Sequence, residues 1–268
     1  MKKTLGIDVG SRCVKLVGFD EGKLLFTEKL DTIRFYRRCR TGSGGIDIAA
    51  TIFRSRTFDF DRIVSTGYGR HSVKIDGAEV TSEIRAHALG AVFQTGLSDF
   101  TLVDIGGQDT KIVKIRRKEV DDFVMNDKCA AGSGRYLENI SRSLDISVEE
   151  IATYSAEPVK LSITCAIFGE SEVIGYLAEG TPLERICAGA NLSVAQRILS
   201  LIRRYDSSVY VITGGVAKNR AVVGFIRERC GGEVLVPEHP IHNGAMGCCL
   251  HAGAETPNNK KSCVDISN

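Results

Sequence analysis

Short apolar runs alternate with glycine-rich turns in the first half of the chain. Residues 5–7 and 14–19 flank one such turn, and residues 101–103 and 112–115 flank another. Runs of this length that are rich in aliphatic residues and bounded by glycine predict β-strands on either side of tight turns. We therefore expect at least two strand–turn–strand units.

Helical patterns dominate the second half. Leu137, Ile140 and Leu144 fall on one face of a helix that follows a loop of small residues. Further helices are expected through Val173 and Leu177, over residues 183–205, over residues 219–229, and in a closing Gly/Ala-rich segment. Residues 34–45 are basic and are expected to form a loop. The pattern as a whole predicts an α/β fold.

Two of the turns repeat one another. DVGSRCVKLV, which begins at Asp8, and DIGGQDTKIV, which begins at Asp104, share Asp, Gly, a small residue, Lys and an aliphatic pair at the same offsets. The repeat indicates two related lobes, each built around a sheet, that face one another. We expect these lobes to span residues 1–95 and 96–268, with the final helix able to pack on the first lobe.

The repeated turns have the chemistry of a phosphate site. Small residues accept positive φ and let backbone N–H groups approach phosphate oxygens, while an Asp at a strand end can hold Mg²⁺ through water. A third turn, TGGVAKN from Thr213, follows an apolar run and precedes a helix, which suits a flat ligand such as adenosine. One turn alone is equally compatible with an ordinary hairpin, but two in register favour a triphosphate held between lobes.

Composition narrows the class of protein. The 268 residues are 43% hydrophobic and 25% charged, which excludes a disordered chain. The 35 basic and 33 acidic residues provide no strong field for nucleic acid, and no apolar run approaches the roughly 20 residues that span a bilayer. The start, MKKTLGIDVG, lacks the apolar run of a signal peptide. We expect a cytoplasmic protein without nucleic-acid or membrane partners.

Nine cysteines require an explanation in a reducing compartment. They form no CxxC pair, which excludes a zinc ribbon or a ferredoxin-type run, and the five histidines show no metal-ligand spacing. Cys129 and Cys165 each precede a predicted helix, whose dipole stabilises a thiolate. A two-fold dimer could supply four thiolates to one [4Fe–4S] cluster, although spacing alone favours buried structural cysteines. The core role is expected for Cys13, Cys187, Cys230, Cys248 and Cys249.

Three motifs together resemble a known superfamily. GIDVGS, DIGGQDTK and TGGVAKN are similar to the phosphate-1, phosphate-2 and adenosine motifs of actin-like ATPases. The resemblance implies two ribonuclease-H-like lobes with ATP or ADP and Mg²⁺ in the cleft between them. It assigns Mg²⁺ binding and catalysis to Asp8 and Asp104, and positioning of the attacking water to Gln108. The nucleotide-binding residues that it implies are Gly10, Ser11, Lys15, Glu83, Gly106, Gly107, Gly214, Gly215 and Lys218, and it lets Lys111 share in neutralising phosphate.

The cysteine motifs narrow the resemblance. NDKCAAGSGRYLE and TCAIFGESEVI, together with TGYGR and SEIRAHALGA, resemble the activators of 2-hydroxyacyl-CoA dehydratases and the related ATPase subunits of benzoyl-CoA reductases, over residues 4–250. The resemblance implies a homodimer bridged by one [4Fe–4S] cluster on Cys129 and Cys165. It further implies ATP-driven, one-electron transfer to a cluster-containing dehydratase or reductase, with ferredoxin or flavodoxin as the electron donor.

Two other functions remain open at this point. A small-molecule kinase of the same superfamily would use Asp109 as its catalytic base, and a metal-free nucleotide switch would use only the cleft. Neither alternative gives the two cysteine-bearing segments a role.

Overall fold

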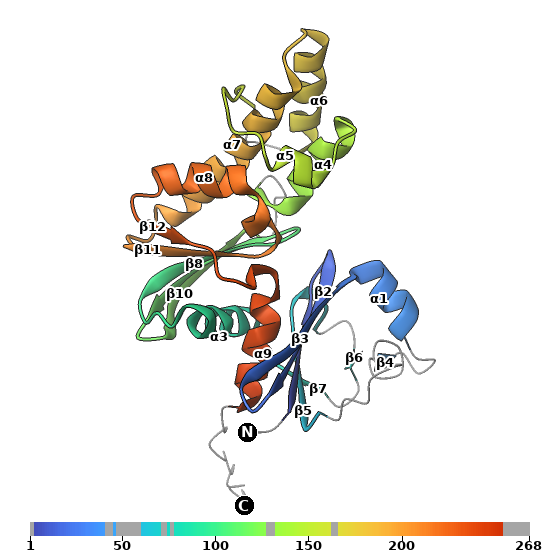
Figure 1. The fold of residues 1–268 in the computed structure, drawn as a ribbon, viewed down its shortest axis with the longest axis vertical. Helices are drawn as coiled ribbons and strands as arrows, with labels where there is room; N and C mark the ends of the chain where they lie inside the picture. Colours follow the sequence, from blue (N-terminus) through green and yellow to red (C-terminus); the bar gives the residue numbers. More distant parts are fainter. Residues whose placement is uncertain are drawn as a thin grey trace, which may run out of the picture.

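Two five-stranded sheets organise the computed structural model, which describes residues 3–40, 45–46, 60–70, 74–75, 78–126, 132–161 and 166–253. The sheets lie in separate lobes that face one another across a central helix pair, and a group of helices extends from the far side of the second lobe (Figure 1). This arrangement confirms the α/β fold with two related lobes that the repeated turns predicted.

The first sheet has the order β3-β2-β1-β5-β7. The first three strands are antiparallel, and β5 and β7 add to β1 in parallel. A separate two-stranded pair is formed by β4 and β6. The strands of this lobe are β1 (Thr4–Val9), β2 (Cys13–Asp20), β3 (Lys23–Asp31), β4 (Gly45–Ile46), β5 (Arg62–Thr66), β6 (Lys74–Ile75) and β7 (Ala78–Val80).

The second sheet repeats this topology in the order β10-β9-β8-β11-β12. Its first three strands are again antiparallel, and the last two again run parallel to the central strand. The repeat extends to register, because Asp8 lies opposite Lys15 and Asp104 lies opposite Lys111. The strands are β8 (Phe100–Ile105), β9 (Thr110–Arg116), β10 (Glu119–Asn126), β11 (Val209–Thr213) and β12 (Glu233–Leu235).

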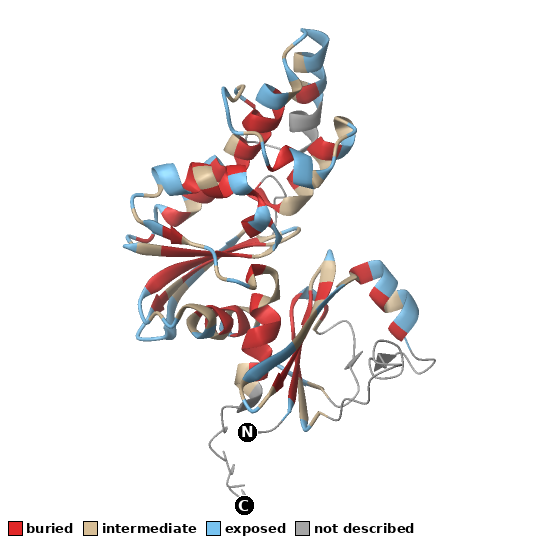
Figure 2. Cartoon of the chain, viewed as in Figure 1, coloured by how far each residue is buried: buried red, intermediate tan, exposed pale blue. Residues whose placement is uncertain are grey.

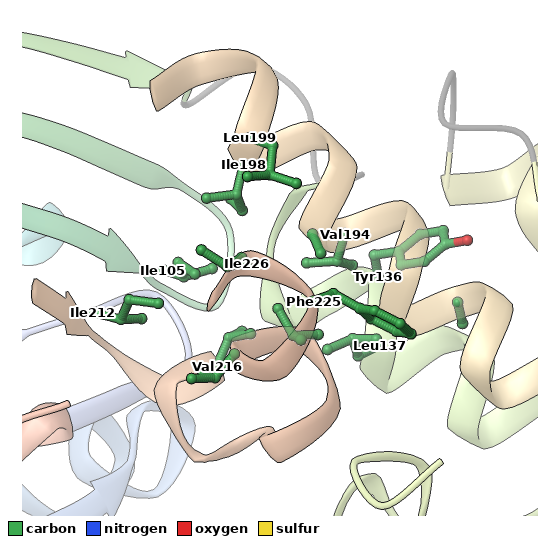
Figure 3. Packing of buried hydrophobic residues seen from close by; sticks show 14 of the residues in the cluster. Ile105, Tyr136, Leu137, Val194, Ile198, Leu199, Ile212, Val216, Phe225 and Ile226 are labelled. Carbon is green, nitrogen blue, oxygen red and sulfur yellow. The ribbon is translucent and has the colours of Figure 1, made fainter. Parts of the chain in front are cut away.

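Helices cover both faces of the second sheet. Side chains from α4, α6, α7 and α8 form the largest buried cluster on one face, and α3 packs against the other (Figures 2 and 3). None of the described helices has the length and apolar character that crossing a bilayer requires. The helices are α1 (Thr32–Cys39), α3 (Glu83–Thr95), α4 (Gly134–Ser143), α5 (Val148–Ile151), α6 (Ala166–Ala178), α7 (Leu183–Ile202), α8 (Arg220–Arg229) and α9 (Asn243–Gly253), with short 3₁₀ turns at η1 (Tyr68–Arg70), η3 (Gly215–Lys218) and η4 (Pro240–His242).

Local signals fix the ends of several helices. The Ser82 side chain accepts a hydrogen bond from the Arg85 N–H at the start of α3, and Gly96 ends this helix in the left-handed region at φ 71°. Asn219 caps α8 in the same way by accepting from the Val222 N–H. The helix expected over 219–229 is therefore confirmed, with Asn219 as its capping residue.

The basic segment that was expected to be a loop is in part a helix. Residues 32–39 form α1, capped by Asp31, which accepts a hydrogen bond from the Arg34 N–H. Phe35 and Cys39 are buried against the first sheet, whereas Arg37 and Arg38 point outward. The loop expectation was wrong there because arginines on the outer face masked an amphipathic pattern.

The central helix pair, α3 and α9, joins the two lobes. α9 packs on β1, β2 and β5 of the first sheet, while α3 packs on the second sheet and against α9. The crossing is closer than any side chain would allow: a Cβ at Gly247 would stand 1.7 Å from the Ala86 carbonyl oxygen, and one at Gly90 would stand 2.0 Å from that of Asn243. Where the chain divides between lobes stays a prediction, since α3 precedes residue 96 yet covers the second sheet.

The close crossing of α3 and α9 requires a residue without a side chain at position 247. Gly247→Ala should lower the free energy of unfolding by roughly 1–3 kcal/mol, because the two helices must move apart to admit the methyl group. A Cβ at Gly224, in the middle of α8, would meet no atom within 4 Å. Gly224→Ala should therefore leave the free energy unchanged or raise it by up to about 1 kcal/mol. Urea unfolding followed by circular dichroism measures both, and equal effects would contradict the tight crossing.

Candidate functional site

A cavity of about 950 Å³ opens between the two lobes. It is lined by every residue that the sequence assigned to ATP or Mg²⁺, so tertiary structure brings the three motifs together. The roles of the individual residues remain predictions. Those residues are Asp8, Gly10, Ser11, Lys15, Glu83, Asp104, Gly106, Gly107, Gln108, Gly214, Gly215 and Lys218.

Two buried carboxylates form the centre of the cavity wall. Asp8 and Asp104 lie near the ends of the central strands of the two sheets, and each is only 2% exposed. The Lys15 ammonium donates to Asp8 Oδ2 at 3.0 Å, and the Thr213 hydroxyl donates to Asp104 Oδ1 at 2.8 Å. Burial alone would raise the pKa of Asp104, but the neighbouring His87, Lys111 and Thr213 bring it well below its usual range. Asp104 therefore stays ionised at neutral pH.

Lys111 is buried among carboxylates of both lobes. Its Nζ lies 2.6 Å from Asp109 Oδ2, 3.0 Å from Glu83 Oε1 and 3.6 Å from Asp104 Oδ2. Burial lowers the pKa of this lysine, yet the three carboxylates raise it overall, which keeps the ammonium charged. Its charge is thus already shared among protein groups, in contrast to the open lysine expected at a phosphate.

Acidic and basic side chains lie close together at the centre of the cavity. Asp8, Glu83, Asp104 and Asp109 face two lysines, and Arg70 adds its guanidinium at 3.9 Å from Glu83. Ligand atoms of Asp8, Glu83 and His87 all lie within 4.8 Å of one another and could hold a metal ion. Carboxylate oxygens are the ligands that Mg²⁺ prefers, so Asp8 and Glu83 fit the magnesium that accompanies a nucleotide triphosphate, whereas the imidazole nitrogen of His87 does not.

His87 is a site residue that sequence spacing did not reveal. It is 4% exposed, and its Nδ1 lies 3.2 Å from Asp104 Oδ1. Burial lowers the pKa of the imidazole, but Asp104 and Asp8 raise it overall. The signal was missed because His87 lies on α3, which meets the two aspartates only in the folded chain.

Both repeated turns are closed tightly around small residues. The Gly10 N–H donates to the Cys13 carbonyl at 3.2 Å, and the Gly106 N–H donates to the Asp109 carbonyl at 2.9 Å. A Cβ at Gly106 would lie 2.6 Å from Asp109 Oδ1. These positions leave backbone facing the cavity, as phosphate binding requires.

The repeat continues at the fourth strand of each sheet. Thr66 pairs with Asp8 and is followed by Gly67 at φ 96°, just as Thr213 pairs with Asp104 and is followed by Gly214 at φ 86°. TGYGR is thus the first-lobe counterpart of TGGVAKN. The sequence contained this signal, but only the strand pairing makes the correspondence clear.

The third turn is anchored from behind by a buried amide pair. Asn219 ends the turn, and its Nδ2 donates to Asn191 Oδ1 at 2.8 Å. The Asn191 amide in turn donates to the Ile151 carbonyl at 2.7 Å, which ties α8, α7 and α5 together. Among the described residues, apart from the two chain neighbours of Gly215, no atom lies within 4 Å of a Cβ placed on this glycine, so the turn leaves room for a flat ligand.

The two candidate cluster cysteines, Cys129 and Cys165, lie outside the described residues. The helices that follow them, α4 and α6, begin at Gly134 and Ala166 and pack against one another. Among the described cysteines, burial raises the pKa of Cys187 and Cys249 to about 12. Their thiols remain protonated at neutral pH, as the predicted core role requires.

Comparison with known proteins agrees with the geometry of the cleft. A family model described as the BadF/BadG/BcrA/BcrD ATPase family matches residues 5–252. The chain belongs to this family of ATPases. Membership makes ATP, ADP and Mg²⁺ the ligands of the cleft.

Members of the family are similar over nearly the whole chain. The (R)-2-hydroxyglutaryl-CoA dehydratase activating ATPase of Acidaminococcus fermentans is 37% identical over 257 residues, which cover 93% of this chain and 96% of that protein. A benzoyl-CoA reductase subunit of Thauera aromatica is 30% identical, and 93% of each chain is covered. The structure of a 2-hydroxyisocaproyl-CoA dehydratase activator from Clostridium difficile, with bound ADPNP, superposes with a TM-score of 0.82 at 34% identity, covering 93% of this chain and 94% of the other.

The buried carboxylate of Asp104 on β8 is expected to be required for ATP hydrolysis. Asp104→Asn should reduce the rate of ATP hydrolysis by roughly 10²–10³-fold, since it removes a fixed negative charge facing the phosphates and their metal ion. Phosphate release measures the rate, and nucleotide binding should persist.

The matched control is Asp122→Asn on edge strand β10. Asp122 accepts hydrogen bonds from Arg204 and Tyr205 and does not line the cavity. This variant should hydrolyse ATP at the parental rate. Equal rates for Asp104→Asn and Asp122→Asn would contradict the catalytic assignment.

Proposed function

We propose that this protein is an ATP-driven activator that delivers one electron at a time to a dehydratase or reductase acting on CoA thioesters. In the proposal two copies of the chain share one [4Fe–4S] cluster, held by Cys129 and Cys165 of each. One electron enters from reduced ferredoxin or flavodoxin and leaves to the partner, while ATP is hydrolysed to ADP and phosphate. The bound cluster would supply a one-electron carrier, which the amino acids alone lack.

The observation that carries the proposal is a direct connection between the nucleotide turn and the helix that follows Cys129. The Gly134 N–H donates to the Gly106 carbonyl at 2.9 Å, and the Arg135 N–H donates to the Gly107 carbonyl at 2.8 Å. The first turn of α4 is thereby bonded to the phosphate-2 turn. A change at the phosphates can therefore reach the segment that bears Cys129 through one hydrogen-bonded step.

A second connection reaches the same segment from the strand beyond the turn. The Thr110 hydroxyl on β9 donates to the Gly132 carbonyl at 2.8 Å, and both groups are buried. Gly132 is three residues after Cys129 in the chain. In a two-lobed ATPase, ATP drives such a segment only if ATP and ADP bind its two arrangements unequally.

Residues of the cleft have distinct parts in the proposal. Asp8 and Asp104 would hold Mg²⁺ from opposite lobes, Gln108 would orient the attacking water, and the turn amides would bind the phosphates. Lys111, charged and surrounded by carboxylates, would hold the acidic wall together rather than bind phosphate. Lys218 lies at the cavity edge beside the third turn, where it would meet the nucleoside.

The names of the relatives favour an activator over a kinase. Those relatives are described as dehydratase activators or as a benzoyl-CoA reductase subunit. A glucokinase from Streptomyces griseus, 16% identical with a TM-score of 0.56, covers 93% of this chain and 98% of the other, and shares the fold alone. The kinase alternative thus has support only at the level of fold.

Anaerobic purification tests the proposal. The protein should be a brown dimer with about four irons per pair of chains and should hydrolyse ATP. Cys129→Ala and Cys165→Ala should each lose the iron and the colour, because each would remove two of the four expected ligands. Iron analysis and the visible absorption spectrum provide the measurement.

Cys187→Ala is the matched control for these variants. Cys187 is fully buried in α7 and its pKa is raised, so the change should retain iron. A colourless protein that phosphorylates a small sugar or acid would contradict the proposal in favour of a kinase. A colourless protein that only binds ATP would contradict it in favour of a nucleotide switch.

A further inference from the structure

One side chain crosses the nucleotide cleft at its rim. Arg12 lies in the turn between β1 and β2, and its Nε donates to Glu138 Oε1 on α4 at 2.9 Å. Its Nη1 donates to Asp31 Oδ2, in the first lobe, at 2.6 Å. A single guanidinium therefore holds one carboxylate from each lobe.

The stem of Arg12 makes a second contact across the cleft. A Cβ placed on Gly107 would lie 2.9 Å from the Cβ of Arg12, so the arginine rests on the backbone of the phosphate-2 turn. Arg12 thus belongs to the phosphate-1 turn, contacts the phosphate-2 turn, and forms an ion pair with Glu138 on α4. Any relative movement of the lobes must change at least one of these contacts.

One face of helix α4 is packed into the core of the second lobe. Tyr136 and Leu137 are each 1% exposed and pack into the large cluster beside Val216 and Phe225 (Figure 3). Glu138, the next residue, points instead toward the cavity that it lines. A change in the pairing of this carboxylate therefore affects a helix whose first turn is hydrogen-bonded to the phosphate-2 turn.

We propose that Arg12 is a positioning residue that senses the nucleotide and sets the position of α4 through Glu138. Guanidinium groups bind phosphate and carboxylate with the same planar set of donors. A terminal phosphate between Ser11 and Gly107 competes with Glu138 for Arg12, whereas its release restores the pair. ATP and ADP thereby leave α4 held differently.

This inference rests on the proposed function only in requiring ATP in the cleft, and it is independent of any cluster. Backbone hydrogen exchange in residues 134–143 reports on α4 in the intact protein with ADP or with a non-hydrolysable ATP analogue. In the parent protein the exchange rates should differ between the two nucleotides. In Glu138→Gln this difference should shrink about two- to fivefold, the range of an exposed ion pair, with little change in the affinity for ADP.

Two further variants separate coupling from simple loss of a surface contact. Glu79→Gln breaks a comparable pair, with Arg62 at 2.7 Å, that lies within the first sheet. It should leave the nucleotide-dependent exchange of α4 unchanged. Arg12→Gln should reduce the difference as Glu138→Gln does, and the double variant should go no further, because the Arg12–Glu138 pair is the interaction that the two changes have in common.

Three outcomes would overturn the inference. Exchange in α4 that is identical with both nucleotides in the parent protein would show that the helix does not respond. A Glu138→Gln protein that keeps the full difference in α4 exchange between the two nucleotides would show that the Arg12–Glu138 pair does not transmit the nucleotide state to α4. Failure of the parent protein to bind ATP at all would overturn this inference and the proposed function together, whereas the first two outcomes leave the proposed function intact.

Discussion

The structure depends on two buried carboxylates that lie where the two sheets face one another. Asp8 and Asp104 occupy equivalent positions on the central strands, each opposite a lysine of the neighbouring strand. Buried charge is costly unless it is paired, and here the pairing groups come from both lobes: Lys15 from the first, Lys111 and Thr213 from the second, and His87 from the connecting helix α3. The fold thus keeps two carboxylates at the cavity wall by surrounding them with donors and basic groups.

Glycine at helix crossings and turns allows this meeting of lobes. α3 and α9 cross with backbone against backbone, which places the lobes on either side of a narrow joint (Figure 1). The cavity opens between these lobes. The carbonyl groups of the phosphate-2 turn accept hydrogen bonds from the first turn of α4. The phosphate-2 turn and the first turn of α4 are therefore separated by single hydrogen bonds, which suits coupling between ATP hydrolysis and a distant event.

Much of the site could be predicted because its residues are carried by short local motifs. DIGGQDTK specifies a strand end, a tight turn and the next strand within eight residues, and its repeat in the first lobe reveals the second half of the site. His87 could not be found in this way, since a helical residue shows no sign of the strand it will meet. The helix α1 was missed for a related reason: its arginines suggested a loop until Phe35 and Cys39 were seen to share a buried face.

The α/β class and the two-lobed repeat could be predicted from the amino-acid sequence, because hydrophobic periodicity and glycine-rich turns act over a few neighbouring residues. The nucleotide-binding residues followed from the resemblance of three short motifs to those of actin-like ATPases. Three features became clear only in the folded chain. Lys111 is surrounded by three carboxylates, TGYGR and TGGVAKN occupy equivalent positions in the two sheets, and Arg12 forms an ion pair with Glu138. Each of these facts joins residues that are far apart along the chain or on different elements. Their distances follow from how sheets and helices pack in three dimensions, which no local pattern contains.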